Sequence, residues 1–410
     1  MKHSRRSFIR NTAGAFAAFT IIPRKVLGRG YTAPSDQLTK AVIGVGEMGK
    51  NHFAYGGTRV VAICDVDRTH LAAAKALLGQ GVKTFDDYRK VVQLPEADII
   101  HIATPPHWHS LITMAAASAG KDIWCETPMA RTIGESKRMM ETVQQYGRMF
   151  RLNTSWRLDN PKIRKAKKLV SSGLLGWPVS LTIGKGTGFE WSANWTGKTN
   201  LPVMPVPATL NYDRWLGPAP YKPYHPHRVH QTFRGYWDYD GGTLGDTGQQ
   251  YLDAVQYILG KDNTSPVSVE IDAPLQHPDA VGTWKRITYT YDDGCQVVLD
   301  NDGDVWIEGP KGKVYPDFRS DIADLEKRLA PYPEPLTEQA DFNTSVRLRQ
   351  PFAINEANGH RSCTLVNMAK IALQVGRTLE FDPVKQRFAY DDGANALIDP
   401  PMRAPWNLQA

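Results

Sequence analysis

The stretch Lys40-Ala-Val-Ile-Gly44-Val-Gly46-Glu-Met-Gly49 decides how the rest of the sequence is interpreted. A short run of β-forming residues stops at Gly44, and helix-forming residues follow Gly46. Glycines at this spacing, between a strand and a helix, are typical of a turn that holds the pyrophosphate of a dinucleotide. Gly44 permits the tight turn, Gly46 lets the backbone approach the phosphates, and Gly49 lets the helix and strand pack closely. The helix N-terminus then faces the phosphates.

An acidic residue follows at the distance that the same pattern requires. A β run over 59–64 ends at Asp65, about 20 residues after the first glycine. We expect the Asp65 carboxylate to accept hydrogen bonds from the adenosine ribose and to repel a 2′-phosphate. Glu47 and Met48, inside the glycine turn, are expected to contact the same cofactor. The sequence therefore predicts bound NAD, with NADP less favoured.

Strand-like and helix-like segments alternate over residues 36–155. Strands separated by helices of 10–15 residues predict a parallel sheet with helices on both faces. We therefore expect an α/β chain that starts with a Rossmann-type, doubly wound dinucleotide domain over 36–155. The expected strands are 40–44, 59–64, 98–103 and 122–125, and the expected helices are 47–55, 68–78, 110–119 and 133–146.

The pattern changes after residue 155. Residues 173–234 are rich in proline, glycine and aromatic side chains, on which sugars stack their C–H faces. Turn-separated β runs follow, and they predict an α+β domain over 156–385 with an open, mostly antiparallel sheet, then a tail over 386–410. The aromatic residues are Trp177, Trp191, Trp195, Trp215 and Tyr221; the β runs are 267–271, 286–291, 296–299 and 305–308; a helix is expected at 359–375.

The N-terminus has the features of a targeting segment over residues 1–28. Ser4-Arg5-Arg6-Ser7-Phe8-Ile9-Arg10 has the twin-arginine form, and an alanine-rich apolar run follows over 13–22. Cleavage after Val26-Leu27-Gly28 and an uncleaved basic amphipathic helix both stay open. The segment predicts transport of the folded protein by the twin-arginine translocase into the periplasm, a route suited to a protein that already holds its cofactor.

Composition excludes two classes of protein. Of 410 residues 41% are hydrophobic and 22% charged, and no apolar run reaches membrane-spanning length, so we expect no stable membrane insertion. The net charge is +7, but six positive charges and no acidic residue lie in 1–28, which leaves +1 for the rest. A nearly neutral body gives no electrostatic reason to bind nucleic acid.

The cysteines and a histidine cluster point to no metal site. The four cysteines, Cys64, Cys125, Cys295 and Cys363, are widely spaced without a CxxC pair, which favours free buried thiols. His225, His227 and His230 cluster after Tyr224, but prolines break their spacing and no regular ligand pattern results. We therefore predict no metal.

Four stretches resemble the glucose–fructose oxidoreductase / inositol dehydrogenase / MocA (Gfo/Idh/MocA) family. They are 44–49, Ala103-Thr-Pro-Pro-His-Trp-His109, Cys125-Glu-Thr-Pro-Met129 and Asp246-Thr-Gly-Gln-Gln-Tyr-Leu-Asp253; the tail segments 377–382 and 401–406 are similar to exported members. The resemblance implies a tightly held nicotinamide cofactor, a sugar or cyclitol substrate, and a dimer or tetramer formed through the open sheet. It also implies that the cofactor contacts include Thr104, Pro105, His109, Glu126 and Arg157.

Two positions depart from the family pattern. The fifth-strand motif usually reads Glu-Lys-Pro, and this chain has Thr127 where the lysine stands. The later motif usually carries a histidine that serves as the base, and this chain has Gln250 there. Threonine supplies no positive charge and glutamine cannot take a proton. Both changes fall in the proton-transfer machinery.

We therefore expect an altered catalytic arrangement. Asp246 is the candidate base, His109 or Lys185 would assist it, and Gln250 would hold a substrate hydroxyl. Lys185 and Arg157 are also candidates for the missing positive charge. Three functions stay open: an NAD-dependent oxidoreductase acting on a sugar, glycoside or cyclitol; an NAD-dependent glycosidase or lyase working through transient oxidation; and a non-catalytic NAD- or sugar-binding protein.

Overall fold

The computed structural model describes residues 37–187 and 195–408. Its contacts divide the chain into two units, 1–38 and 39–410, and only the second is described below. The predicted targeting segment and Trp191 lie outside the described residues.

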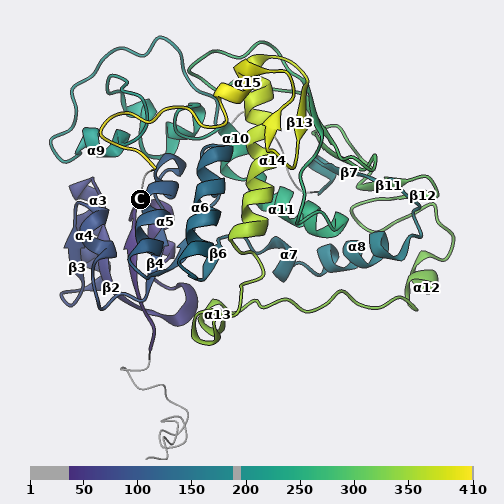
Figure 1. The fold of residues 1–410 in the computed structure, drawn as a ribbon, viewed down its shortest axis with the longest axis horizontal. Helices are drawn as coiled ribbons and strands as arrows, with labels where there is room; N and C mark the ends of the chain where they lie inside the picture. Colours follow the sequence, from purple (N-terminus) through teal and green to yellow (C-terminus); the bar gives the residue numbers. More distant parts are fainter. Residues whose placement is uncertain (1–36, 188–194, 409–410) are drawn as a thin grey trace, which may run out of the picture. The chain divides into compact units, whose positions relative to one another are not determined.

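A six-stranded sheet forms the first half of the second unit (Figure 1). Its order is β3-β2-β1-β4-β5-β6, and every neighbouring pair is parallel, as the alternating sequence pattern predicted. The central strands are buried on both faces because helices cover both sides. The strands are β1 (Thr39–Ile43), β2 (Arg59–Cys64), β3 (Lys83–Phe85), β4 (Ile99–Ile102), β5 (Asp122–Cys125) and β6 (Phe150–Leu152).

The helices of this half follow their strands directly. Asp67 and Thr132 cap two of them by accepting hydrogen bonds from Thr69 N–H and Glu135 N–H. The first helix ends at Asn51, earlier than the expected residue 55, and Gly56 follows with a left-handed backbone (φ 71°). The helices are α2 (Glu47–Asn51), α3 (Arg68–Leu78), α4 (Tyr88–Val92), α5 (His109–Ser118) and α6 (Ile133–Gln145), with short 3₁₀ turns η3 (Tyr55–Gly57) and η4 (Pro106–Trp108).

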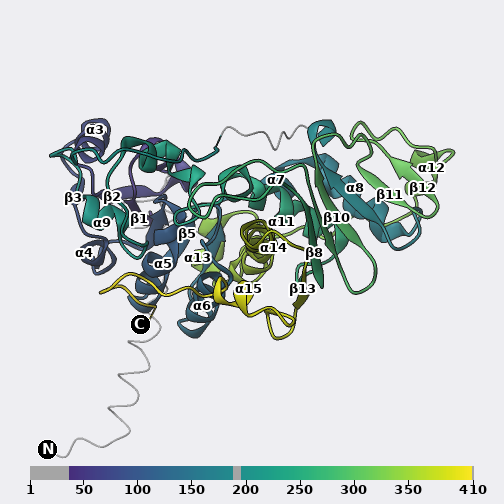
Figure 2. The same ribbon diagram turned by 90° about the horizontal axis from the view of Figure 1, so that it is seen from above.

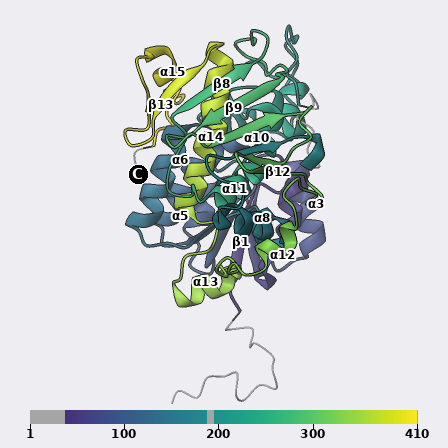
Figure 3. The same ribbon diagram turned by 90° about the vertical axis from the view of Figure 1, so that its right-hand side faces the viewer.

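An eight-stranded sheet forms the second half (Figure 3). Its order is β12-β11-β7-β10-β9-β8-β13-β14, antiparallel throughout except for the parallel pair β7–β10. The predicted fold class is therefore confirmed. The strands are β7 (Ser180–Ile183), β8 (Ser268–Asp272), β9 (Arg286–Thr290), β10 (Gln296–Asp300), β11 (Ile307–Gly309), β12 (Gly312–Val314), β13 (Leu379–Asp382) and β14 (Arg387–Phe388).

Helices cover one face of this sheet. Tyr289 of β9 donates a hydrogen bond to the Leu365 carbonyl of the long helix α14, which also packs against α6 and so joins the two halves (Figure 1). On the opposite face, Thr182, Glu270 and Thr288 are partly or fully exposed. The helices are α7 (Trp156–Asp159), α8 (Pro161–Ser172), α9 (Tyr212–Leu216), α10 (Gly242–Asp246), α11 (Gly248–Leu259), α12 (Leu325–Leu329), α13 (Phe342–Leu348), α14 (Glu356–Val375) and α15 (Asp392–Ala396).

Residues 201–236, the covering segment, leave the second half and pack against the first. Asn211 N–H donates to the Val66 carbonyl, and Arg68 N–H donates to the Thr209 carbonyl. Figure 2 shows α9, which belongs to this segment, beside strands β1–β3. The segment also carries the 3₁₀ turns η6 (Pro226–Arg228) and η7 (His230–Gly235). Residues distant in sequence therefore meet beyond the carboxyl ends of the parallel strands.

Two further predictions concern helices and thiols. Among the described residues, no helix combines the length and the apolar character that crossing a bilayer requires. All four cysteines belong to the described part of the chain, and each is a buried free thiol. Burial raises the pKa of the Cys125 and Cys363 thiols, which keeps them unreactive near neutral pH.

Candidate functional site

One cavity of about 1070 Å³ lies at the carboxyl ends of the parallel strands. Open α/β sheets bind their ligands at this edge. The glycine turn and the loops after β2, β4 and β5 form one wall, and the covering segment with α10 and α11 forms the other. The volume reaches the upper end of the usual range for ligand sites, so a dinucleotide and a small substrate fit together.

The glycine turn has the geometry that its sequence predicts. Gly44 has φ +82°, and a Cβ there would lie 2.6 Å from the Ala103 carbonyl oxygen. A Cβ on Gly49 would lie 2.0 Å from the Gly44 oxygen, so this glycine lets α2 approach the strand. Gly46 is the N-cap of α2 and offers no side-chain cap, which leaves the first-turn N–H groups to face the cavity. The turn therefore fits a phosphate group.

Asp65 is held rigidly beside this turn. One carboxylate oxygen accepts a hydrogen bond from Val45 N–H at 2.9 Å, and the other accepts one from Asp67 N–H at 2.8 Å. His70 Nδ1 lies 3.6 Å from Asp65 Oδ2, and Asp65 raises the pKa of that imidazole. Each carboxylate oxygen keeps a second lone pair for a ribose hydroxyl. The cavity wall here thus fits the adenosine part of NAD.

The remaining predicted cofactor residues divide into two groups. Glu47, Met48, Thr104, Pro105 and Glu126 line the cavity, together with Gly44, Gly46 and Asp65. Gly49, His109 and Arg157 are not among the lining residues. Gly49 acts through the packing described above, and the other two are considered below.

Aromatic residues form the wall of the cavity at the end near Asp65. They were not assigned to the cofactor site from the sequence. Trp406, from the C-terminal tail, packs edge-on against Trp108 with ring centroids 4.9 Å apart, and Arg89 lies over the Trp406 ring. Arg403 anchors that tail through an ion pair with Asp213 of α9 at 2.6 Å. The tail therefore forms part of the cavity wall.

The covering segment closes the same end of the cavity with charged contacts. Arg214 pairs with Asp86 at 2.8 Å, and Gln231 donates a hydrogen bond to Glu47. His230, whose backbone φ is 55°, places Nε2 3.4 Å from Asp67 Oδ2. A cofactor in the cavity would lie beneath these contacts.

Glu126 connects the cavity with a buried histidine pair. Its carboxylate accepts hydrogen bonds from His52 Nε2 and from Asn153 Nδ2, both at 2.6 Å. The second ring nitrogen of His52 lies 2.9 Å from His101 Nδ1, and burial lowers the pKa of His101. This series of hydrogen bonds orients the Glu126 carboxylate. His52 could have been considered from the sequence alone as a residue near the cofactor site, since it comes three residues after Gly49, the last glycine of the turn.

The two positions that depart from the family pattern touch each other. Gln250 Nε2 donates a hydrogen bond to Thr127 Oγ1 at 3.3 Å, and both residues line the cavity. The neighbouring Gln249 fixes the backbone by accepting a hydrogen bond from Met129 N–H at 2.6 Å. Neutral polar groups therefore occupy the place where a charged lysine and a titrating histidine were expected.

Asp246 lies in the same part of the cavity and is paired with an arginine. Arg234 Nε donates to Asp246 Oδ1 at 2.5 Å, and the guanidinium lies over the Trp195 ring at 5.1 Å. Side-chain exposure of about one fifth on both partners leaves them accessible to a ligand. Arg234 brings the positive charge that neither Thr127 nor Gln250 supplies. Sequence reasoning missed Arg234, although it stands twelve residues before Asp246 in the aromatic stretch.

A second carboxyl group, also missed, lies beside Asp246. Asp240 is 1% exposed, lines the cavity, and its Oδ1 has no hydrogen-bond partner among the described residues. Burial and the negative charge of Asp246 raise the pKa of Asp240, and Arg234 and Lys370 oppose that rise. Two neighbouring carboxyl groups with different environments are the usual arrangement for separate acid and base roles.

His109 has a different place from the expected one. It is fully buried, with Nδ1 2.9 Å from the Pro128 carbonyl oxygen and Nε2 2.8 Å from the Thr104 carbonyl oxygen. Both ring nitrogens face backbone carbonyl oxygens, and because burial lowers the pKa of His109, its neutral imidazole donates a hydrogen bond to one of them. The expectation that it assists proton transfer is replaced by a positioning role, since it ties the loop after β4 to the loop after β5.

Lys185 and Arg157 also lie outside the cavity lining. Lys185 is exposed in a short 3₁₀ turn, η5 (Lys185–Thr187). Arg157 is 2% exposed and pairs with Glu338 at 2.7 Å, Asp262 at 3.2 Å and Asp253 at 3.5 Å. A buried charge needs such partners. These two residues therefore do not supply the missing positive charge.

The fold and this cavity define a two-domain protein of the dinucleotide-binding class. A profile described as "Oxidoreductase family, NAD-binding Rossmann fold" matches residues 38–154, and one described as "Oxidoreductase family, C-terminal alpha/beta domain" matches residues 159–408. The chain belongs to the Gfo/Idh/MocA oxidoreductase family, as the resemblance implied.

Three known proteins illustrate its relationships. Levoglucosan dehydrogenase of Pseudarthrobacter phenanthrenivorans is 28% identical over 60% of this chain and 58% of its own length. D-glucoside 3-dehydrogenase of Escherichia coli is 24% identical over 67% of this chain and 70% of its own length. The crystal structure of the WlbA dehydrogenase from Bordetella pertussis, with NADH and UDP-GlcNAcA, superposes with a TM-score of 0.58 at 18% identity and covers 84% of this chain and 99% of that one. The chain thus spans under two thirds of the levoglucosan dehydrogenase.

Proposed function

We propose that the protein is an NAD-dependent oxidoreductase that acts on a hydroxyl of a sugar, glycoside or cyclitol. One observation carries the proposal: a single cavity joins the glycine turn and Asp65 to the carboxyl pair Asp240 and Asp246. A dinucleotide site and a proton-transfer site in one cavity are the two parts that hydroxyl oxidation needs. The names of the relatives, which act on levoglucosan and on D-glucosides, support a carbohydrate substrate.

The cofactor proposal is NAD, held tightly. The Gly46 turn would hold its pyrophosphate and Asp65 its adenosine ribose, and the fixed negative charge of Asp65 disfavours NADP. When bound, the nicotinamide accepts a hydride from a carbon atom. The contacts of Arg214, Gln231 and His230 with the first domain support slow release, since they close over the adenosine end.

The proton steps are assigned to this chain's own residues. Asp246 takes the hydroxyl proton as the substrate carbon loses its hydride, so the alcohol becomes a carbonyl. Arg234, 2.5 Å from Asp246, stabilises negative charge that develops on the substrate oxygen. Gln250 and Thr127 hold neighbouring hydroxyl groups by neutral hydrogen bonds. His109 keeps the two loops that carry these contacts in register.

A second candidate function is favoured by Asp240. A carboxyl group that stays protonated near neutral pH can donate a proton to a departing oxygen, and simple hydroxyl oxidation needs no such acid. This supports a glycosidase or lyase in which the hydride is returned and no net oxidation occurs. Slow cofactor release suits that chemistry, because the same bound cofactor serves every turnover.

The experiment that separates these functions uses purified protein without added NAD. It is incubated with a panel of glycosides, free sugars and cyclitols, while bound-cofactor absorbance and sugar products are followed together. A dehydrogenase gives one stoichiometric absorbance change and an oxidised sugar. A redox-neutral enzyme gives many turnovers of cleaved product with no lasting change. If neither signal appears with any compound and NAD is nevertheless bound, the non-catalytic alternative replaces both.

Export and assembly belong to the proposal as well. We propose that the twin-arginine segment sends the folded, cofactor-loaded protein to the periplasm through the twin-arginine translocase, and that it works there as a dimer or tetramer. Replacing Arg5 and Arg6 with lysine should retain the protein in the cytoplasm; unchanged export contradicts the assignment.

The open face of the second sheet is the proposed interface, so Thr182→Arg with Thr288→Arg should lower the mass measured by light scattering. An unaltered mass would place the interface elsewhere.

A further inference from the structure

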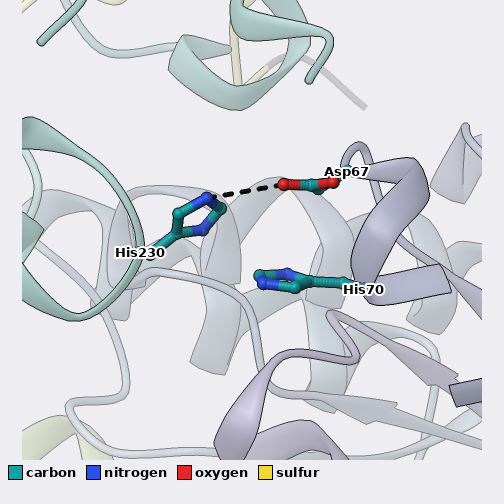
Figure 4. A group of neighbouring side chains, drawn as sticks. All are labelled: Asp67, His70 and His230. Atoms are coloured by element: carbon teal, nitrogen blue, oxygen red, sulfur yellow. Dashed lines mark ion pairs between the residues drawn. The ribbon is translucent and has the colours of Figure 1, made fainter. Parts of the chain in front are cut away.

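Three metal-ligating side chains meet where the covering segment touches the first domain (Figure 4). Asp67 caps the N-terminus of α3, His70 lies in the first turn of the same helix, and His230 begins η7 in the covering segment. Each offers one ligand atom, and these atoms all lie within 4.8 Å of one another. The cluster is separate from the Asp240–Asp246 end of the cavity and takes no part in the proton steps.

The spacing suits a tetrahedral cation. Zinc binds imidazole nitrogen and carboxylate oxygen at close to 2.1 Å, so two of its ligands stand about 3.4 Å apart. His230 Nε2 and Asp67 Oδ2 are separated by 3.4 Å. Because the ligand atoms lie within 4.8 Å of one another, His70 needs a shift of at most about 1.4 Å to reach the same spacing, which rotation of a side chain that is 31% exposed permits.

His70 has one competing contact, since its Nδ1 lies 3.6 Å from Asp65 Oδ2. Asp67 Oδ1 accepts the capping hydrogen bond from Thr69 N–H at 2.8 Å, and Oδ2 is the oxygen that faces His230. His230 adopts a left-handed backbone conformation with φ 55°, which costs free energy for a residue other than glycine. Its imidazole points toward Asp67 (Figure 4). Two imidazoles and one carboxylate are the donor set of many zinc sites that keep a fourth position for water.

Although the sequence alone predicts no metal, we propose that Asp67, His70 and His230 bind one Zn²⁺ ion that ties the covering segment to the dinucleotide domain. The ion would add a cross-link between residues more than 150 positions apart, at the end of the cavity where the adenosine would lie. Its consequence is kinetic: opening of the covering segment, and hence release of the cofactor, becomes slower when zinc is bound. This goes beyond the proposed oxidoreductase function and does not depend on the substrate.

The binding test uses the full chain without a histidine tag, treated with EDTA and freed of it. Zn²⁺ is titrated in competition with a chromophoric chelator, and Co²⁺ is added in parallel because its visible d–d absorption reports tetrahedral coordination. We expect one ion per chain. His230→Ala, His70→Ala and Asp67→Asn should each weaken binding at least about tenfold, as loss of a direct ligand costs no less than loss of an outer-shell partner. Asp67→Asn keeps the helix cap, so the helix stays intact.

His225→Ala is the matched control, since this histidine belongs to the same segment but not to the cluster. Its zinc affinity should equal that of the unaltered protein. Equal zinc binding by all variants, or no zinc binding by the unaltered protein, overturns the site. The second readout is the rate at which NAD leaves the protein: zinc should slow it only when all three ligands are present. An unchanged release rate despite zinc binding overturns the cross-link, and neither readout requires catalytic turnover.

Discussion

Gln250 donates a hydrogen bond from Nε2 to Thr127 Oγ1 across 3.3 Å, so the two residues that depart from the family pattern are in contact. They come from opposite domains, 123 positions apart in sequence. Neither can carry positive charge or take a proton near neutral pH. Both departures therefore fall at one place, and the proposed mechanism assigns the proton chemistry to the neighbouring Asp246, Arg234 and Asp240.

The first prediction concerns the base. Asp246→Asn should lower kcat by about 10²–10⁴, because a well-placed general base contributes that much. Binding of NAD, measured by calorimetry, should be unchanged, since Asp65 and the glycine turn lie at the other end of the cavity. Asp317→Asn, a change at an exposed carboxylate, is the control and should be neutral. Full activity in Asp246→Asn would remove Asp246 from the mechanism.

The second prediction concerns the positive charge. Arg234→Gln should lower kcat by about 10²–10³, the usual effect of losing a donor to a developing oxyanion. Arg234→Lys should recover part of the loss, because it restores the charge without the planar geometry. Arg319→Gln, at an exposed position away from the cavity, serves as the control. Equal rates for the glutamine and lysine variants would show that charge at this position does not matter.

The third prediction follows from the raised pKa of Asp240. The ordinary pKa of an aspartate is about 4. At pH values above this, the Asp240 carboxyl group keeps its proton in the folded protein but has lost it in the unfolded chain. Its contribution to stability is therefore complete below that value and is lost as the pH rises through the raised pKa. A tenfold change in the proton affinity of such a group corresponds to about 1.4 kcal/mol of unfolding free energy.

Asp240→Asn removes this dependence. Thermal unfolding at pH 5 and pH 9 should show the variant gaining stability relative to the unaltered protein at the higher pH. Asp246, Arg234 and Lys370 face Asp240 in the unaltered protein, and the negative charge of Asp240 raises the pKa of Lys370, so the variant removes that effect too. A stability difference that does not vary with pH would mean that Asp240 is ionised in the folded state. The variant's cleavage activity reports separately on the acid role.

The fourth prediction concerns cofactor choice. Asp65→Ala should weaken NAD binding about 10- to 150-fold, which corresponds to the 1.5–3 kcal/mol of a hydrogen bond to a charged group. NADP should bind relatively better, because the charge that repels its 2′-phosphate is gone. The matched measurement is the ratio of the two dissociation constants. A ratio equal to that of the unaltered protein would contradict the role of Asp65.

The parts of the site that depend on local sequence were predictable. Gly44 and Gly49 have their expected geometry because a strand, a tight turn and a helix constrain their backbone within a few residues. The position of Asp65 was predictable from the same strand–turn–helix pattern. Four of the six parallel strands were predicted for a similar reason, since each alternation of strand and helix is short, but the three-residue strands β3 and β6 were not.

The parts that depend on distant segments were not predictable. Arg234 and Asp240 reach the cavity only because the covering segment packs against Val66 and Arg68, and no periodic pattern encodes that path. Arg157 was expected at the cofactor, but its three carboxylate partners come from positions 253, 262 and 338. The parallel pairing of β7 with β10 inside an otherwise antiparallel sheet likewise requires a long excursion between the two strands.

The packing of Trp406 against Trp108 has a consequence for synthesis. The cavity wall combines the glycine turn near the start of the described chain with an aromatic ring near its end, so a nascent polypeptide on the ribosome cannot assemble it. The cavity wall is therefore complete only after residues 401–406 have emerged and Arg403 has paired with Asp213. A chain that ends before residue 401 would lack this part of the cavity wall.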